Sequence, residues 1–121
     1  MATVTAMEIL QIANRLDTRV LCAGAGTEVS RAVASDRMSD LLEHASSSTL
    51  LVTNLATPQL LDMAELMDVP AVCVTSPEPP AAAFLEAARR GRVAVIVSPL
   101  GGEETRRRLA DLLHAEAHAP P

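Results

Sequence analysis

Three short aliphatic runs recur along the chain and set the pattern of the whole sequence. They cover residues 49–53, 71–75 and 93–97, so each run starts 22 positions after the previous one. Polar residues do not alternate with apolar ones inside the runs, which is typical of strands buried on both faces. Segments with helical periodicity separate them. The pattern therefore predicts an α/β fold, in which a small parallel or mainly parallel sheet is flanked by helices.

The segments between the runs carry the usual signals of helix starts and ends. Thr57 precedes Pro58, which predicts Thr57 as an N-cap and Pro58 at the first helical position. Pro70 ends this helix. A second helix is expected over residues 80–90, with Gly91 as its C-cap. The predicted buried positions of the two helices are Leu60, Leu61, Ala64, Leu66, Met67, Ala83, Phe84, Ala87 and Ala88.

The segments before the first run are shorter and less regular. We expect a helix over residues 6–16 and a strand over 19–23. Residues 28–36 fit either a strand or a short helix. Ser39 is the expected N-cap of a helix over 40–45.

Length and composition are those of one ordered domain. The chain has 121 residues, of which 49% are hydrophobic and 21% charged, and no linker or internal repeat divides it. We therefore expect a single domain over residues 1–121. Within it, the sequence GGEETRRRLADLLHAE forms the last helix, and residues 115–121 form a frayed tail.

Missing residue types exclude several classes of function. There is no Lys, Trp or Tyr, and Phe84 is the only aromatic residue. Without Lys, a Walker A phosphate loop and Schiff-base catalysis are excluded. A chain with a net charge of −5 and no aromatic stacking platform is a poor partner for nucleic acid. Because no nucleophile–base pair or carboxylate pair stands at a catalytic spacing, we expect that the protein is not an enzyme.

Cysteine usage and hydropathy indicate the compartment. Cys22 and Cys73 are the only cysteines and lie in apolar runs, so we expect reduced core thiols rather than a redox pair or a zinc site. No signal peptide and no membrane span of ~20 apolar residues is recognisable. These features predict a cytoplasmic protein without a membrane partner.

Polar residues end or follow each of the three aliphatic runs. In a parallel sheet these positions meet at one edge, where ligands commonly bind and helix N-termini offer free amides. The pattern predicts a cleft for a nucleotide or a phosphorylated metabolite. The same residue types also favour ordinary capping and turn hydrogen bonds, which is the alternative interpretation. The candidate residues are Thr53, Asn54, Thr57, Thr75, Ser76, Ser98, Gly101 and Gly102.

Two motifs are too incomplete to predict a cofactor or a metal. Gly24 and Gly26 match the start of a dinucleotide-binding fingerprint, but Val29 stands where its third glycine belongs. His114 and His118 are spaced for one metal ion, but no further ligands are evident. We therefore expect neither a cofactor nor a metal centre.

A run of arginines on the last helix is expected to pair with acidic residues of the same helix. Glu103 and Arg107, and likewise Glu104 and Arg108, are four positions apart in the favourable order. Together with Arg106 they predict a solvated, self-paired helix face. An anionic partner is the alternative interpretation.

The order of these motifs resembles the DRTGG domain family. The features are a leading helix and strand, the block Ser39-Asp40-Leu41-Leu42, the strand LLVTN, the loop VTSPEPP and a final strand VAVIVS. The family's Thr-Gly-Gly step falls on residues 34–36, which are Ala-Ser-Asp here. The resemblance covers nearly the whole chain.

This resemblance implies a regulatory role rather than a catalytic one. DRTGG modules are α/β domains that occur alone or fused to enzymes such as phosphotransacetylase and CBS-containing pyrophosphatase, and they are similar to the N-terminal region of HPr kinase. For this chain, the resemblance implies a non-catalytic regulatory or oligomerisation module that acts as a homodimer. It also implies a metabolic or redox enzyme as a protein partner. The candidate interface residues are Met38, Leu41 and Leu42, or Met63, Leu66 and Met67.

Overall fold

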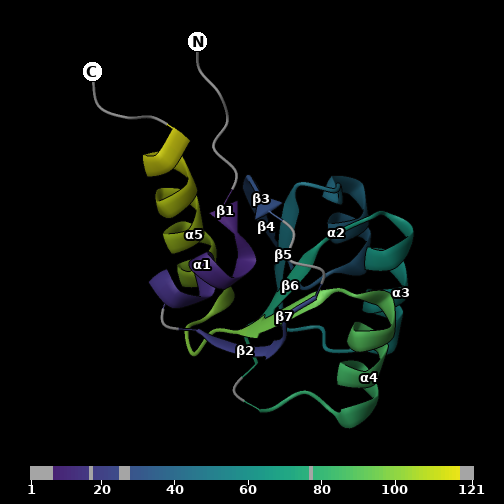
Figure 1. Cartoon of the computed structure of the whole chain (residues 1–121). Helices are drawn as coiled ribbons and strands as arrows, with labels where there is room; N and C mark the ends of the chain where they lie inside the picture. Colours follow the sequence, from purple (N-terminus) through teal and green to yellow (C-terminus); the bar gives the residue numbers. More distant parts are fainter. Residues whose placement is uncertain (1–6, 17, 25–27, 77, 118–121) are drawn as a thin grey trace.

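The structure is a computed structural model that describes residues 7–16, 18–24, 28–76 and 78–117. Its centre is a five-stranded sheet with the strand order β2-β7-β6-β5-β4 (Figure 1). Four strands are parallel, and β2 runs antiparallel to β7 at one edge. The expected α/β fold with a mainly parallel sheet is confirmed. The strands are β2 (Arg19–Cys22), β4 (Arg31–Ala34), β5 (Thr49–Thr53), β6 (Ala71–Val74) and β7 (Ala94–Val97).

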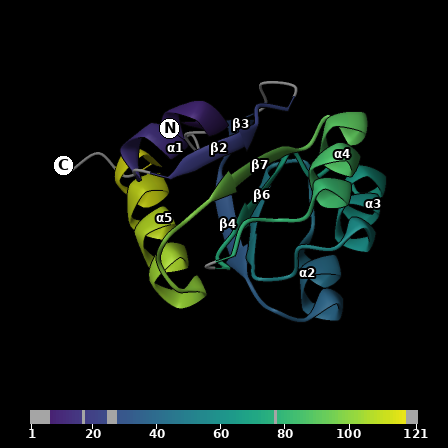
Figure 2. The same ribbon diagram turned by 90° about the horizontal axis from the view of Figure 1, so that it is seen from below.

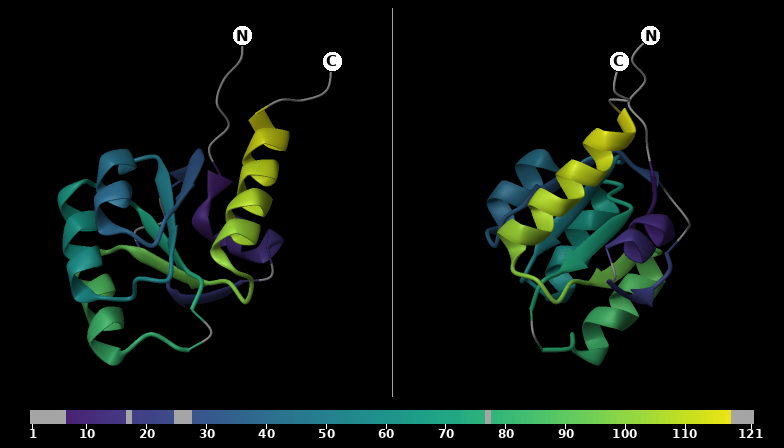
Figure 3. Two further views of the ribbon diagram at one scale, coloured as in Figure 1. Left: turned by 180° about the vertical axis from the view of Figure 1, so that it is seen from behind. Right: turned by 90° about the vertical axis from the view of Figure 1, so that its left-hand side faces the viewer.

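Helices cover both faces of this sheet. Two helices, α1 (Ile9–Arg15) and α5 (Gly102–Ala117), lie on one face (Figures 1 and 2). The other face carries α2 (Met38–His44), α3 (Pro58–Leu66) and α4 (Ala82–Gly91). The long helix α5 crosses its face of the sheet diagonally, as the right-hand view of Figure 3 shows. The molecule is thus a three-layered sandwich of helices, sheet and helices.

A second, minor sheet joins the first residues of the described chain to the segment before β4. Here β1 (Met7–Glu8) pairs antiparallel with β3 (Glu28–Val29). Residues 28–36, which fit either a strand or a short helix in the sequence, thus contain β3 and the whole of β4. The N-terminal helix is shorter than expected and begins only at Ile9, because β1 takes the two positions before it.

The sheet separates two hydrophobic clusters. Successive residues of a strand point to opposite faces, so Leu51 joins the cluster under α2–α4, while Leu50 and Val52 join the cluster under α1 and α5. Phe84 fills the first cluster and Ile12 the second, both without solvent exposure. This two-sided burial is why β5, β6 and β7 are continuously aliphatic. No helix in the described part of the chain is long and apolar enough to cross a membrane.

The start of α2 differs from the sequence expectation. Ser39 is not the N-cap: the helix begins at Met38, and Arg37 occupies the cap position. Ser35 takes over the role of a local organiser, since its Oγ accepts the Arg37 N–H at 3.1 Å and its hydroxyl donates to Asp40 Oδ2 at 3.1 Å. A serine four positions upstream therefore fixes the turn from β4 into the helix.

The ends of α3 and α4 also correct the prediction. Gly91 is the last residue of α4 rather than its C-cap, and Arg92 takes the left-handed conformation there, with φ 56°. Thr57 is the N-cap residue of α3 and Pro58 follows at its start, as expected, but the Thr57 side chain makes no capping bond.

Two residues expected in the core are exposed. Leu66 is 80% exposed because it lies at the end of α3 on its outer side. Ala83, also expected in the core, is exposed.

Candidate functional site

The carboxyl ends of β4, β5, β6 and β7 meet along one edge of the sheet, which we call the carboxyl edge. Each of these strands is followed by a helix, so α2, α3, α4 and α5 all begin near this edge. The first amides of a helix have no intrahelical partners and favour anions. All eight residues of the predicted cleft lie at or just beyond these strand ends.

Two of the eight residues are buried and engaged in turns. Thr53 is fully buried, and its Oγ1 accepts the Leu55 N–H at 3.1 Å. Ser98 is 2% exposed; its Oγ accepts the Leu100 N–H at 3.2 Å and lies 2.8 Å from Thr105 Oγ1. These hydroxyls hold the loops after β5 and β7 in place. The turn interpretation therefore describes the hydrogen bonds that these two side chains make.

The other six residues reach the surface. Asn54, Thr57 and Gly101 are exposed, whereas Thr75, Ser76 and Gly102 are partly buried. The fold brings the end of β6 to the start of α5: a Cβ added to Gly102 would lie 3.8 Å from Thr75 Oγ1. A Cβ on Gly101 would meet nothing within 4 Å. The backbone of this helix start is therefore open to a ligand.

A first hollow of about 230 Å³ adjoins the start of α5, and we call it the Asp36 hollow. One carboxylate oxygen of Asp36 is already hydrogen-bonded within the protein, because Oδ1 accepts the Asn54 N–H at 2.9 Å. Glu103, the second carboxylate of this hollow, is paired with Arg106. The lining residues are Ala34, Ser35, Asp36, Val52, Gly102 and Glu103.

A second hollow, of about 240 Å³, lies at the same edge on the α4 side of the sheet, and we call it the Arg19 hollow. Arg19 reaches it because β2 runs antiparallel to β7, which places Arg19 opposite Val97 at the carboxyl edge. Ser76 is the one member of the predicted cleft that lines it. The lining residues are Arg19, Leu21, Ser76, Glu78, Pro79, Pro80, Leu85 and Val97.

A third hollow, of about 230 Å³, lies at the opposite edge of the sheet, and we call it the Asp68 hollow. Pro70 and Arg92, which line it, precede β6 and β7. Two of its lining residues, Asp68 and Arg92, have positive φ angles of 59° and 56°. They end helices α3 and α4, so the left-handed conformation serves helix termination.

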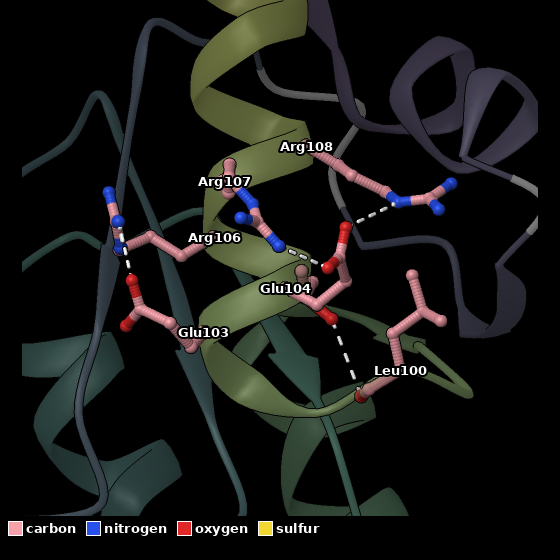
Figure 4. A network of polar contacts seen from close by, with 7 residues as sticks. Leu100, Glu103, Glu104, Arg106, Arg107 and Arg108 are labelled. Carbon is pink, nitrogen blue, oxygen red and sulfur yellow. Dashed lines mark hydrogen bonds and ion pairs between the residues drawn. The ribbon is translucent and has the colours of Figure 1, made fainter.

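The charged side chains near the start of α5 pair with one another (Figure 4). Arg106 binds Glu103 at 2.6 Å, while Glu104 binds both Arg107 and Arg108, the latter at 3.0 Å. Glu104 and Arg108 thus pair as expected, but Glu103 pairs with Arg106 instead of Arg107. The hydrogen bond from Arg106 lowers the pKa of Glu103, and those from Arg108 and Arg107 lower the pKa of Glu104.

The remaining candidates have structural surroundings. In the block of residues 39–42, Leu41 is fully buried and Asp40 accepts the Ser35 hydroxyl. Cys22 and Cys73 are free thiols, and burial raises the pKa of Cys73 to about 12. His118 and Gly26 lie outside the described residues. Within residues 7–16, 18–24, 28–76 and 78–117, no group of three His, Cys, Asp or Glu is placed to hold a metal ion.

Comparison with protein-family profiles finds no matching family, and comparison with curated proteins finds no relative. Among solved structures, the chain is similar to the CBS and DRTGG domains of the regulatory region of a Clostridium perfringens pyrophosphatase, in complex with its activator, diadenosine tetraphosphate. The TM-score is 0.67 and the identity 16%, and the match covers 82% of this chain and 44% of that one. The fold is DRTGG-like. The chain therefore spans less than half the length of this structural neighbour.

The shared DRTGG-like fold agrees with the order of motifs in the sequence. Four of the residues that line the hollows of the carboxyl edge were not identified from the sequence, namely Arg19, Ser35, Asp36 and Glu103. For Arg19 no local signal exists, because its place depends on the antiparallel direction of β2. For Asp36 the signal is its position directly after β4, a segment that the sequence left open between strand and helix.

Proposed function

We propose that this chain is a non-catalytic regulatory domain that binds a nucleotide or a phosphorylated metabolite at its carboxyl edge. The observation that carries the proposal is the DRTGG-like fold, which the chain shares with a regulatory region solved with an activator nucleotide. The open backbone at Gly101 and Gly102 is the second support. Among the described residues, neither hollow of this edge is lined by a histidine or cysteine that would act as a base or nucleophile.

Electrostatics limit where a phosphate group binds. The net charge of −5 repels anions at long range, so binding has to rest on local donors. The carboxyl edge offers the first amides of α5 and the Arg19 guanidinium. The arginines of α5 contribute little, because all three are paired with Glu103 or Glu104.

The glycines at the start of α5 provide the test. Ala fits at either position without a clash, because a Cβ meets no atom closer than 3.8 Å. The variant Gly101→Ala/Gly102→Ala should therefore fold like the wild type but hold an anion farther from the backbone. Calorimetric titration with AMP, ADP, ATP and diadenosine tetraphosphate should show binding of at least one nucleotide to the wild type and weaker binding to the variant. No heat with any of them at millimolar concentration contradicts the proposal.

We also propose that the domain acts as a homodimer. The supporting observation is the exposure of two leucines on the side of the sheet that carries α2 and α3: Leu66 is 80% exposed and Leu42 is 45% exposed. Two residues of the expected interface do not contribute to this surface, since Leu41 is fully buried and Met63 is 9% exposed. An interface would therefore centre on Leu66 and Leu42.

Sedimentation tests the homodimer. The wild type should sediment at twice the chain mass of 12.7 kDa, and Leu66→Glu should sediment as a monomer. Leu10→Glu is the matched control, because Leu10 is 44% exposed but lies on α1, on the opposite side of the sheet. A monomeric wild type at high micromolar concentration overturns this proposal and leaves the nucleotide proposal untouched.

A further inference from the structure

We propose that the Arg19 hollow binds a ligand that combines one flat apolar ring system with one anionic group, of the class of a nucleoside monophosphate. This inference rests on the proposed function, because it assigns the ligand class within the carboxyl edge. The hollow is lined by side chains from β2, the segment after β6, α4 and β7. It is thus built from parts of the chain that are distant in sequence.

The walls of the hollow are apolar and suit the face of a ring. Leu21 and Val97 come from neighbouring strands, and both are partly buried against the core under α2–α4. Leu85 of α4 and the prolines at 79 and 80 complete the walls. The volume of about 240 Å³ is smaller than the ~300–1,000 Å³ of common ligand pockets, so there is room for one ring system.

Arg19 supplies the cation for the anionic group. Its side chain is exposed and makes no ion pair within the described part of the chain, unlike the paired arginines of α5. A guanidinium offers parallel N–H donors that match two oxygens of a phosphate. Arg19 is the first residue of β2 and pairs with Val97, the last residue of β7, so it lies at the carboxyl edge.

Two further polar groups narrow the ligand class. Ser76 Oγ already accepts the Glu78 N–H at 3.3 Å, so its hydroxyl hydrogen remains available for a ligand. The Glu78 carboxylate accepts hydrogen bonds from ring amino groups or ribose hydroxyls, but repels additional phosphates. With one guanidinium and one carboxylate among its lining residues, the hollow favours a monophosphate over a triphosphate.

The test is calorimetric titration of the full chain with AMP, adenosine, ATP and inorganic phosphate. The wild type should bind AMP more tightly than ATP. Arg19→Gln should weaken AMP binding by at least about 10-fold, the usual effect of losing a charge-assisted hydrogen bond, and leave adenosine binding within about 2-fold. Glu78→Gln should reduce the preference for AMP over ATP.

Arg31→Gln is the matched control, because Arg31 is also exposed and also lies on an edge strand, but at the start of β4. It should leave AMP binding within about 2-fold of the wild type. Equal weakening by Arg19→Gln and Arg31→Gln overturns the assignment to the hollow. If AMP affinity is unchanged in Arg19→Gln but reduced in Gly101→Ala/Gly102→Ala, the assignment to the Arg19 hollow is also overturned. This result leaves the proposed function intact. Absence of binding by every nucleotide overturns both.

Discussion

The backbone of Gly24 lies so close to Ala94 that a Cβ on Gly24 would stand 2.6 Å from the Ala94 nitrogen. Gly24 also has a φ of 66°, a backbone conformation that residues other than glycine rarely adopt. The close approach occurs just after β2, where the chain leaves its pairing with β7. Gly24 therefore helps to fix β2 against the sheet, and with it the position of Arg19.

The first prediction concerns this contact. Gly24→Ala should lower the free energy of unfolding by about 2 kcal/mol or more, because a left-handed alanine costs ~1–2 kcal/mol and the clash with backbone adds to it. Urea unfolding measures the change. Gly101→Ala is the control and should change stability by less than about 0.5 kcal/mol, since its Cβ would meet nothing within 4 Å. Equal stabilities of the two variants would contradict the packing described.

The second prediction concerns the end of α4. Arg92 has a φ of 56°, and the Val93 N–H bonds to the Ala88 carbonyl at 3.0 Å, as in helix ends that normally use glycine. Arg92→Gly should therefore stabilise the protein by roughly 1 kcal/mol. Arg89→Gly is the matched control and should destabilise it by roughly 1 kcal/mol, because Arg89 lies inside the helix. Thermal and urea unfolding should agree on the opposite signs.

The third prediction concerns alkaline pH. Burial raises the pKa of Cys73 from 9.0 to about 12, so above pH 9 the unfolded chain loses a proton that the folded chain retains. Stability should therefore fall as pH rises, with a slope approaching about 1.4 kcal/mol per pH unit. The chain has no Lys or Tyr that would titrate in the same range.

Urea unfolding between pH 8.5 and 10.5 measures this slope. Cys73→Ala should be less stable at neutral pH but should show a smaller decline with pH. The wild type and Cys73→Ala are predicted to differ in slope, and parallel curves would rule out the buried neutral thiol as the cause.

In the native state, a thiol reagent should modify Cys22 faster than Cys73, because Cys22 is only partly buried.

The fourth prediction concerns the acidic residues at the start of α5. Hydrogen bonds from Arg108 and Arg107 lower the pKa of Glu104, so its contribution to stability is present above the ordinary pKa of a glutamate and is lost as pH falls through the lowered value. Carboxyl NMR titration should give a pKa below the ordinary 4.5 for Glu104. Arg108→Gln should raise it; an unchanged pKa in this variant would show that the pair does not form in solution.

The sequence predicts those elements of the fold whose local residue pattern is compatible with only one type of secondary structure. The runs that became β5, β6 and β7 are buried on both faces, so their aliphatic content alone identifies them. The direction of β2 was not predictable in this way. Val20, in its middle, is 40% exposed, and an edge strand carries no local mark of whether it runs parallel or antiparallel to its neighbour.

The candidate site was predictable as an edge but not as a set of lining residues. Hydroxyls such as Thr53 and Ser98 follow the strands as expected, yet a hydroxyl next to a turn binds either a ligand or its own backbone, and only the folded structure distinguishes these. Arg19 became a candidate solely through its pairing with Val97, a contact between distant segments. Tertiary geometry decides both cases.

An NMR titration of the isotope-labelled protein with AMP can locate the nucleotide site. Binding at the carboxyl edge should give chemical-shift changes in residues 19–21, 75–76, 85, 97–98 and 101–102 that saturate with a single affinity. Residues of the Asp68 hollow at the opposite edge, such as Ser47, Asp68 and Arg92, should stay unchanged. Changes centred on the Asp68 hollow, or no changes at millimolar nucleotide, would show that the carboxyl edge is not the binding site.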